Sequence, residues 1–405
     1  MLPPPTVESV NAALAPPKNH RDISRVRFAY SYLNEIPKFL KPQGLEYTVV
    51  PGLKRSVKSG QRLHFTTPNA FTLDPVAAGL PWPTGLDCIR QSKFWKSGLS
   101  ISSELLELFA RDEAISQAVK ANGKSLGSIA AHELNTVEED RFTKFATYLF
   151  PEADEGRMRL LAASIVYIVI FDDAWEMVAG NELNDVRDGF LDRLQGRACQ
   201  TPESDLQALI TSTVDGFHEM DAQAGDGGQE VIDRLVDFCR HVPPAQQFDT
   251  LGDYLTYRRI DAGVPYILAC VKFSISSDVE IESPQLEKFL RLISDHVSLV
   301  NDLASYEKEK RAYDQGRTYH LINTVEVVQR LFSLPTENSA KALAYAMQLQ
   351  VEVEVEQELA RMRDNNSLTA EEWQFVDAVL TMTAGNVFYS VVSSRYGGES
   401  TRILE

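Results

Sequence analysis

Apolar residues recur at intervals of three and four over most of the chain after Ile101, with polar residues between them. This spacing places apolar side chains on one face of an α-helix, and turn clusters such as residues 224–229 separate the blocks. No useful length of chain alternates apolar and polar residues as a strand would. The pattern predicts an all-α protein, with helical blocks over residues 102–120, 140–150, 155–180, 186–196, 203–220, 229–242, 251–274 and 283–310, and two more after Asn323.

The first 100 residues have a different character. Stretches such as LPPPT, IPKFLKPQG and GLPWPTG favour turns and extended chain, because proline fixes φ and lacks an N–H. We predict that residues 1–100 are an irregular segment that wraps over the body, with one short helix near residues 31–39. Residues 101–405 are then a single α-helical domain.

Composition and charge narrow the class of protein. Hydrophobic residues make up 44% of the 405 positions, which is enough for a sizeable core. The formal net charge of −17 disfavours nucleic acid as a partner, although a few local cations can still bind a small anion. The most apolar stretch, residues 160–171, is too short to span a bilayer, so we expect a buried core helix and no stable membrane association.

The cysteines and the N-terminus indicate the compartment. The four cysteines lie far apart, without a CxxC pair or metal-ligand spacing, which favours reduced thiols. The first residues lack the basic start and apolar block of a secretory signal. A cytoplasmic protein is therefore expected.

A pair of acidic residues follows the most apolar block. Asp172 and Glu176 lie one helical turn apart and share a helix face, directly after Phe171. Like charges at this spacing destabilise a helix, and a divalent cation with oxygen ligands would offset the repulsion. An ordinary acidic helix end that faces solvent is the alternative.

A second polar set is more specific. Asn301, Ser305 and Glu309 follow one another at four-residue steps, and each step advances only about 40° past a full turn. An amide oxygen, a hydroxyl and a carboxylate then point the same way over two turns, which suits Mg²⁺. Asn and Ser are also unusual inside a helix, because both compete with the backbone for hydrogen bonds.

Together these segments resemble the DDxx(D/E) and NDxxSxxxE magnesium motifs of class I terpene synthases, in the order that the family has them. The resemblance is to fungal-type sesquiterpene cyclases and covers residues ~100 to 396. It implies a single α-helical bundle with a central active-site cavity. It also implies three Mg²⁺ ions, held by Asp172, Asn301, Ser305 and Glu309, with Glu176 as a further ligand or an outer-shell group.

The same resemblance assigns cationic and polar side chains to the diphosphate. Arg258 matches the pyrophosphate sensor, Asp261 the linker and Ala262 the effector, whereas Arg259 points about 100° away on the same helix. Surface ion pairs are the alternative for both arginines. Lys308 matches a further diphosphate contact.

The last motif of the resemblance lies near the C-terminus. Residues 385–396 are similar to the family's GNxxWSxxxxRY ending, in which Arg395 and Tyr396 would close on the diphosphate. The chain departs from this pattern at Tyr389, where the family often has Trp. Aromatic faces stabilise positive charge, so Tyr389, Tyr148, Phe145 and Phe171 are candidates to face a carbocation, with plain core packing as the alternative.

The family's activity is the ionisation and cyclisation of a prenyl diphosphate. Farnesyl diphosphate is the expected substrate, with geranylgeranyl diphosphate as the alternative, and the product is a cyclic hydrocarbon or alcohol. A chain-elongating prenyltransferase is less favoured, because those enzymes normally carry two Asp-rich motifs. A catalytically dead helical interaction protein is a further alternative. Relatives of this type are monomers or homodimers, and none of the seven histidines falls in a metal or triad pattern.

Overall fold

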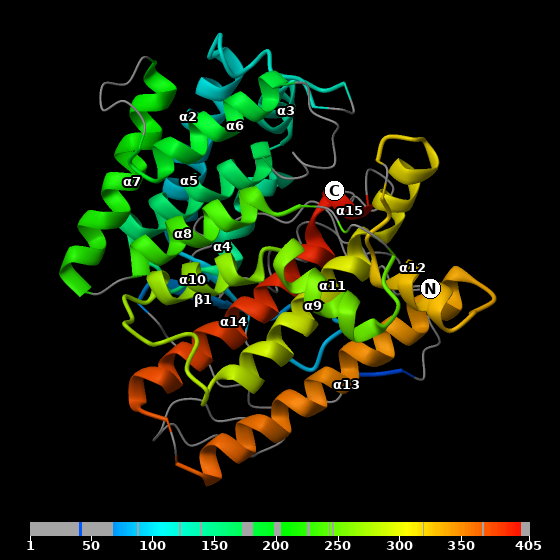
Figure 1. Cartoon of the computed structure of the whole chain (residues 1–405). Helices are drawn as coiled ribbons and strands as arrows, with labels where there is room; N and C mark the ends of the chain where they lie inside the picture. The colour runs from blue at the N-terminus through cyan, green and yellow to red at the C-terminus, as the bar shows by residue number, and fades with distance from the viewer. Residues whose placement is uncertain are drawn as a thin grey trace.

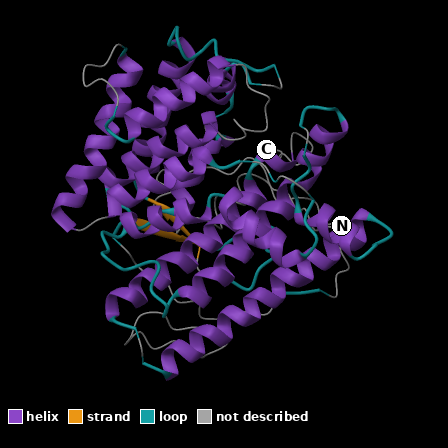
Figure 2. Ribbon diagram, viewed as in Figure 1, coloured by secondary structure: helices purple, strands orange, loops and turns teal. Residues whose placement is uncertain are grey.

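A computed structural model describes residues 40–42, 68–86, 89–120, 123–137, 140–171, 181–197, 204–224, 227–242, 244, 247–318, 320–366 and 368–397. The described chain is helical almost throughout, and only two short strands interrupt the helices in Figure 2. The prediction of an all-α protein is confirmed. The short helix predicted near residues 31–39 lies outside the described residues.

The described helices follow one another along the chain with short connections. Their bounds are α2 Trp95–Arg111, α3 Leu126–Asn135, η3 Phe142–Lys144, α4 Phe145–Leu149, α5 Glu155–Phe171, α6 Asn181–Leu194, α7 Asp205–Ala224, α8 Gly227–Arg240, α9 Leu251–Asp261, α10 Val264–Ser274, α11 Glu287–Asp314, α12 Thr324–Leu331, α13 Glu337–Asp364, α14 Ala370–Val392 and α15 Ser394–Gly397. Figure 1 shows α2, α3 and α5 to α8 on one side of the molecule, with α9 and α11 to α13 on the other.

A small antiparallel sheet precedes the helices. Strand β1 (Ala70–Leu73) pairs with β2 (Ile89–Ser92) in a register that sets Ala70 opposite Ser92. The sequence pattern does not predict these strands, and it also places the first long helix later than Trp95, where α2 begins. The Pro-rich region therefore contains regular structure in its described part.

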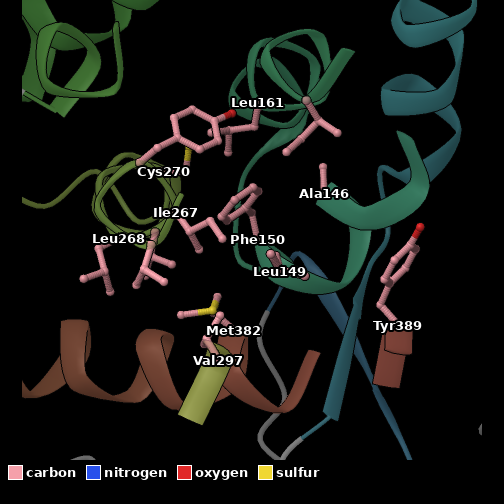
Figure 3. Close-up of a cluster of buried hydrophobic side chains, with 14 of the residues drawn as sticks. Ala146, Leu149, Phe150, Leu161, Ile267, Leu268, Cys270, Val297, Met382 and Tyr389 are labelled. Atoms are coloured by element: carbon pink, nitrogen blue, oxygen red, sulfur yellow. The ribbon is translucent and has the colours of Figure 1, made fainter. Parts of the chain in front are cut away.

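The core is built on two almost wholly buried helices, α5 and α14. Every residue of α14 from Phe375 to Val392 is buried, which explains its continuous apolar character. This helix is long and apolar enough to cross a membrane by composition, but its apolar window is entirely enclosed by the fold. Figure 3 shows α14 contributing Met382 to a cluster with Ile267, Leu268 and Phe150 from neighbouring elements.

Close packing of α14 against α4 depends on Gly385. A Cβ atom at this position would lie 2.1 Å from the backbone oxygen of Tyr148, so no larger residue fits without moving a helix. The contact fixes the C-terminal half of α14 beside α4. This half carries Tyr389 and leads into α15, which packs against α11 (Figure 1).

Helices α9 and α10 are separated by a sharp break. Gly263 adopts φ +67°, a left-handed conformation that favours glycine, and Pro265 occupies the first turn of α10. Thr250 caps the N-terminus of α9 by accepting a hydrogen bond from the backbone N–H of Asp253. The helical block predicted over residues 251–274 is therefore two helices with a kink at Asp261–Gly263.

Candidate active site

Arg258 is the centre of the candidate active site. It lies in the last turn of α9 and is 7% exposed. Its Nε donates to Asp302 Oδ1 at 2.8 Å and its Nη2 donates to Asn301 Oδ1 at 2.7 Å, both on α11. Its Nη1 donates to Asp261 on α9. The guanidinium therefore joins the predicted sensor segment to the predicted metal motif.

Neighbouring carboxylates keep Arg258 charged. Burial alone would lower the pKa of its guanidinium, but Asp302 and Asp261 outweigh this effect and hold the pKa well above its usual range. Burial would likewise raise the pKa of Asp261, and Arg258 together with His241 lowers it. The Nε2 atom of His241 lies 3.5 Å from Asp261 Oδ1, a proximity that the sequence does not predict.

Asp302 is the most connected residue of the site, and the sequence assigned it no role. Its side chain is fully buried and accepts hydrogen bonds from four donors. Besides Arg258 Nε, these are the Tyr254 hydroxyl, the Thr324 hydroxyl and, at 2.9 Å, the Thr324 backbone N–H. Asp302 thus ties α9, α11 and α12 together and fixes the orientation of Arg258.

The three residues of the second metal motif lie on one side of α11. Ser305 is 2% exposed, and its hydroxyl oxygen has no hydrogen-bond partner among the described residues. Glu309 Oε2 accepts a 2.9 Å hydrogen bond from the Nδ2 of Asn323. That amide also donates to the backbone carbonyl of Asp302 at 2.9 Å, so Asn323 holds the Glu309 carboxylate against α11.

The donor set fits a hard divalent cation. A buried hydroxyl without a partner is costly unless a ligand completes its bonding, and Ser305 presents such an oxygen between Asn301 and Glu309. Burial raises the pKa of Glu309, as expected for a carboxylate whose counter-charge comes from a bound cation. No cluster of three or more His, Cys, Asp or Glu side chains within the described residues could hold a metal, so the mixed oxygen set on α11 is the candidate there.

The first metal motif is not placed. Asp172 and Glu176 lie outside the described residues, so their predicted position opposite Asn301 stays a prediction. The described chain reaches Phe171 at the end of α5, whose ring stacks on Phe190 of α6 at 4.4 Å. This stacking makes Phe171 a core residue of the α5 and α6 packing.

Tyr396 meets the metal motif from the C-terminal side. The Nδ2 of Asn301 donates to the Tyr396 hydroxyl at 3.4 Å, and the Tyr396 ring lies edge-on to Tyr389 at 6.3 Å. Tyr389 itself contacts Phe145 at 4.8 Å, with the two rings edge-on. Figure 3 shows Tyr389 at one edge of the labelled core cluster.

The remaining predicted residues are spread around this centre. Arg395 lies next to Tyr396, and its guanidinium stacks on the Phe142 ring at 4.7 Å. Lys308 is partly exposed on α11, and its charge offsets part of the rise that burial causes in the pKa of the adjacent Glu309. Tyr148 packs edge-on to Phe388 at 5.0 Å, apart from the Tyr389 and Phe145 pair.

The break between α9 and α10 frees backbone carbonyls beside Arg258. Pro265 lacks the N–H that would donate to the Asp261 carbonyl in a continuous helix. No backbone N–H of the described residues donates to the carbonyl of Ala262. The carbonyl oxygen of Ala262, the predicted effector, therefore has no donor among the described residues. Ala262 directly follows Asp261, which pairs with Arg258.

Known proteins are similar to this chain in sequence and in fold. A sequence model of terpene synthase family 2, for its C-terminal metal-binding part, matches residues 163–350. Terpene cyclase 6 of Gibberella fujikuroi is 27% identical over 331 residues, which are 80% of this chain and 85% of that protein. Terpene cyclase aneC of Aspergillus aculeatus is 26% identical over 354 residues, which are 83% of this chain and 75% of that protein.

The fold agrees with these matches. The crystal structure of aristolochene synthase from Penicillium roqueforti superposes with a TM-score of 0.58, covering 73% of this chain and 95% of that chain at 17% identity. The matched region contains both metal motifs and Arg258. The family match and the relatives support the assignment of this chain to the class I terpene synthases, and the shared fold agrees with it.

Proposed function

We propose that this terpene synthase uses Mg²⁺ to ionise farnesyl diphosphate and closes the carbocation into a cyclic sesquiterpene, with release of diphosphate. The main support is the buried contact of Arg258 with Asn301, because it brings a diphosphate-binding cation to the metal motif. A guanidinium at this position can donate directed hydrogen bonds to an oxyanion, while a metal ion neutralises the negative charge of that oxyanion.

The leaving group needs several positive and hydrogen-bonding partners, because diphosphate carries multiple negative charges. Arg258, Lys308, Arg395 and the Tyr396 hydroxyl are the groups that we assign to it. Arg258 and Tyr396 already meet at Asn301, so two of the four converge before any ligand binds. Such preorganisation lowers the cost of ordering side chains around the charge that develops as the C–O bond breaks.

We assign three Mg²⁺ ions to the ligand set Asp172, Asn301, Ser305 and Glu309, with Glu176 as an additional ligand. When bound, Mg²⁺ supplies Lewis-acid stabilisation of the departing diphosphate oxygens. The residues of the chain hold and orient this set. Asn323 fixes the Glu309 carboxylate, and Arg258 fixes the amide oxygen of Asn301 so that its second lone pair is available.

The cation formed after ionisation must be kept from water. Tyr389 lies edge-on to Tyr396, and Phe145 lies edge-on to Tyr389. We assign these two rings to the stabilisation of positive charge, because an aromatic face does so without a nucleophilic atom. We also assign the carbonyl oxygen of Ala262, which has no donor among the described residues, to the stabilisation of positive charge. We assign deprotonation of the last cation to the released diphosphate. We expect the enzyme to act in the cytoplasm, as a monomer or homodimer.

Product analysis tests this function directly. Purified protein incubated with farnesyl diphosphate and Mg²⁺ should release diphosphate and volatile cyclic products, and excess EDTA should stop both. Turnover of geranylgeranyl diphosphate alone would assign a C20 substrate. Longer prenyl diphosphates formed with isopentenyl diphosphate would identify an elongating enzyme. No diphosphate release from any prenyl chain length would mean that the fold is catalytically dead.

Single substitutions test the metal assignment. We expect Asn301→Ala and Asp172→Ala each to abolish diphosphate release while the helical circular dichroism signal is retained. Near-normal turnover by either variant would remove that residue from the metal site.

A further inference from the structure

We propose that the segment of residues 140–144, which joins α3 to α4, positions Arg395 and Tyr396 for the diphosphate. This inference rests on the proposed function, because it assigns a role to residues that act through the diphosphate-binding pair. Neither metal motif nor the C-terminal motif includes this segment. Its residues touch the start of α15 through a hydrogen bond and a ring contact, and Glu133 of α3 adds a charge interaction.

The hydrogen bond anchors the backbone of α15. Asp140 is 9% exposed, and its Oδ1 accepts a 2.7 Å hydrogen bond from the backbone N–H of Ser394. Ser394 is the first residue of α15 and directly precedes Arg395. The backbone N–H of Arg395 donates to the Ser393 hydroxyl at 3.2 Å, which holds the next peptide as well. The chain therefore enters α15 at a fixed point.

The side chain of Arg395 is held by the same segment. Its guanidinium lies over the Phe142 ring at 4.7 Å, a stacking geometry that restricts a flexible side chain to one plane. Glu133 of α3 adds an opposite charge near Arg395, and its carboxylate accepts a hydrogen bond from the backbone N–H of Thr143 at 3.2 Å. Arg395 thus rests between a ring and a carboxylate supplied by α3 and η3.

Fixing α15 also fixes Tyr396. Its ring lies edge-on to Tyr389, which in turn contacts both Phe142 at 5.9 Å and Phe145 at 4.8 Å. At the other end of the ring, the hydroxyl receives the hydrogen bond from Asn301. The aromatic cluster of Phe142, Phe145, Tyr389 and Tyr396 therefore transmits the position of the 140–144 segment to the metal motif.

These contacts prepare the pair before ligand binds. A free arginine loses considerable side-chain entropy when it binds an anion, and a guanidinium already stacked in place loses less. The expected consequence is tighter binding of diphosphate without any contact between residues 140–144 and the ligand. Asp140 and Phe142 are accordingly positioning residues.

Calorimetric titration with inorganic diphosphate in saturating Mg²⁺ tests the ring contact. We expect Phe142→Leu to weaken diphosphate binding about fivefold to tenfold, the scale of one lost cation–π contact. Phe142→Tyr keeps the ring face and should bind as the wild type does. In an Arg395→Ala background, Phe142→Leu should cause a clearly smaller loss, because only the ring contacts through Tyr389 to Tyr396 remain for it to act on. Equal losses in both backgrounds would overturn the proposal.

Amide hydrogen exchange tests the backbone anchor without any ligand. Asp140→Ala should speed exchange of the Ser394 amide at least tenfold, whereas Asp140→Asn retains the acceptor oxygen and should restore protection. Asp74→Ala is the matched control, since Asp74 Oδ1 accepts a similar bond from the backbone N–H of Ala77 in a loop outside the site. Unchanged exchange in Asp140→Ala would contradict the anchor.

The two proposals fail in different ways. A wild-type protein that turns over farnesyl diphosphate, with Phe142→Leu binding diphosphate normally, overturns only the positioning role. A wild-type protein that neither binds diphosphate nor turns over a prenyl diphosphate overturns both.

Discussion

Arg258 serves the fold as well as the proposed chemistry, because it neutralises Asp302, which is fully buried. Arg258→Ala should therefore lower the free energy of unfolding by about 3–5 kcal/mol, the cost of leaving a buried charge without its partner. Turnover should fall by about 10²–10³, the scale of one lost hydrogen-bond donor to a developing oxyanion. Urea denaturation and steady-state kinetics measure the two effects separately.

Arg259 is the matched control for this substitution. It lies on the same helix as Arg258 and forms an ion pair with Asp295 at 2.8 Å, but its side chain is 25% exposed. Arg259→Ala should also cost about 1–3 kcal/mol of stability, because it leaves the buried Asp295 carboxylate without its partner, but it should leave kcat near the wild-type value. Equal losses of turnover in Arg258→Ala and Arg259→Ala would contradict the sensor assignment of Arg258.

Replacing Ser305 should impair function without lowering stability. Its buried hydroxyl has no partner in the described chain, so Ser305→Ala should leave the melting temperature unchanged or raise it. The same change removes a proposed Mg²⁺ ligand, so half-maximal turnover should need at least tenfold more Mg²⁺.

Ser298 provides the contrast on the same helix. Its hydroxyl donates to the backbone carbonyl of Ser294 at 2.8 Å and is fully buried. Ser298→Ala should cost about 1 kcal/mol of stability without altering the Mg²⁺ requirement. A Mg²⁺ requirement that stays normal in Ser305→Ala would remove this serine from the metal site.

At the scale of helices, the break between α9 and α10 positions Ala262 and can be tested through Gly263. A side chain there must adopt φ +67°, and its Cβ would lie 3.2 Å from the Phe238 ring. Gly263→Ala should cost about 1–2 kcal/mol of stability through backbone strain. Turnover should also fall severalfold, because relief of the crowding shifts the Ala262 carbonyl relative to Arg258.

Gly316 is the control that separates the effect of backbone strain from the effect of the position of Ala262. It has the same φ of +67° at the end of α11, but a Cβ atom there meets nothing within 4 Å. Gly316→Ala should show a similar loss of stability in thermal unfolding and normal turnover. If Gly263→Ala also retains normal turnover, the effector assignment of Ala262 is wrong.

Local sequence signals predicted most of the helices, but the links between them poorly. The helix predicted over residues 102–120 ends at Arg111, and α3 lies in none of the predicted blocks. The periodicity of residues 251–274 indicates helix on both sides of Gly263, and the Gly-Val-Pro sequence is the only local sign of the break. Strand β2 escapes prediction because its buried Arg90 is paired with Glu152 and Asp377, partners that lie far away along the chain. Pairing of this kind depends on tertiary structure.

In the candidate site, too, local sequence signals reveal some residues, and tertiary structure alone reveals the others. Asn301, Ser305 and Glu309 can be found from helical spacing alone, because they lie on one helix. The residues that support them cannot be found in this way, since Asn323 and Tyr254 contact the motif from outside α11. Asp302 could have been suspected, because it lies inside the motif and a charged residue between Val300 and Leu303 must be paired when buried.

At the scale of the whole molecule, a buried carboxylate joins the Pro-rich segment to the helical body. Glu352 of α13 accepts hydrogen bonds from the Thr84 hydroxyl at 2.6 Å and from the Gly85 backbone N–H at 2.8 Å. Its Oε1 also lies 2.9 Å from Nε2 of His296 on α11. Residues 84–85 are thus attached to α11, which carries the second metal motif, and to α13, which packs against it.

This attachment should depend on pH. Burial would raise the pKa of Glu352, but the hydrogen bonds from His296, Thr84 and Gly85 outweigh burial and lower it below its usual value of 4.5. A depressed carboxyl pKa contributes stability above the unfolded-state value, and that contribution is lost as the pH falls through the folded-state value. Glu352→Gln should therefore cost about 1–3 kcal/mol at pH 7, with a difference from wild type that shrinks below about pH 4.5.

Thermal unfolding between pH 3 and pH 7 measures this difference. Glu354→Gln, two residues further along α13, is the control. The Glu354 carboxylate accepts only an exposed hydrogen bond from Gln350 among the described residues, so its loss should change stability by less than about 0.5 kcal/mol at any pH. A deficit in Glu352→Gln that is equally large at pH 3 and pH 7 would show that the shape of the side chain, rather than its charge, holds residues 84–85. A deficit confined to neutral pH would place the ionised Glu352 at the junction between the N-terminal segment and the catalytic helices.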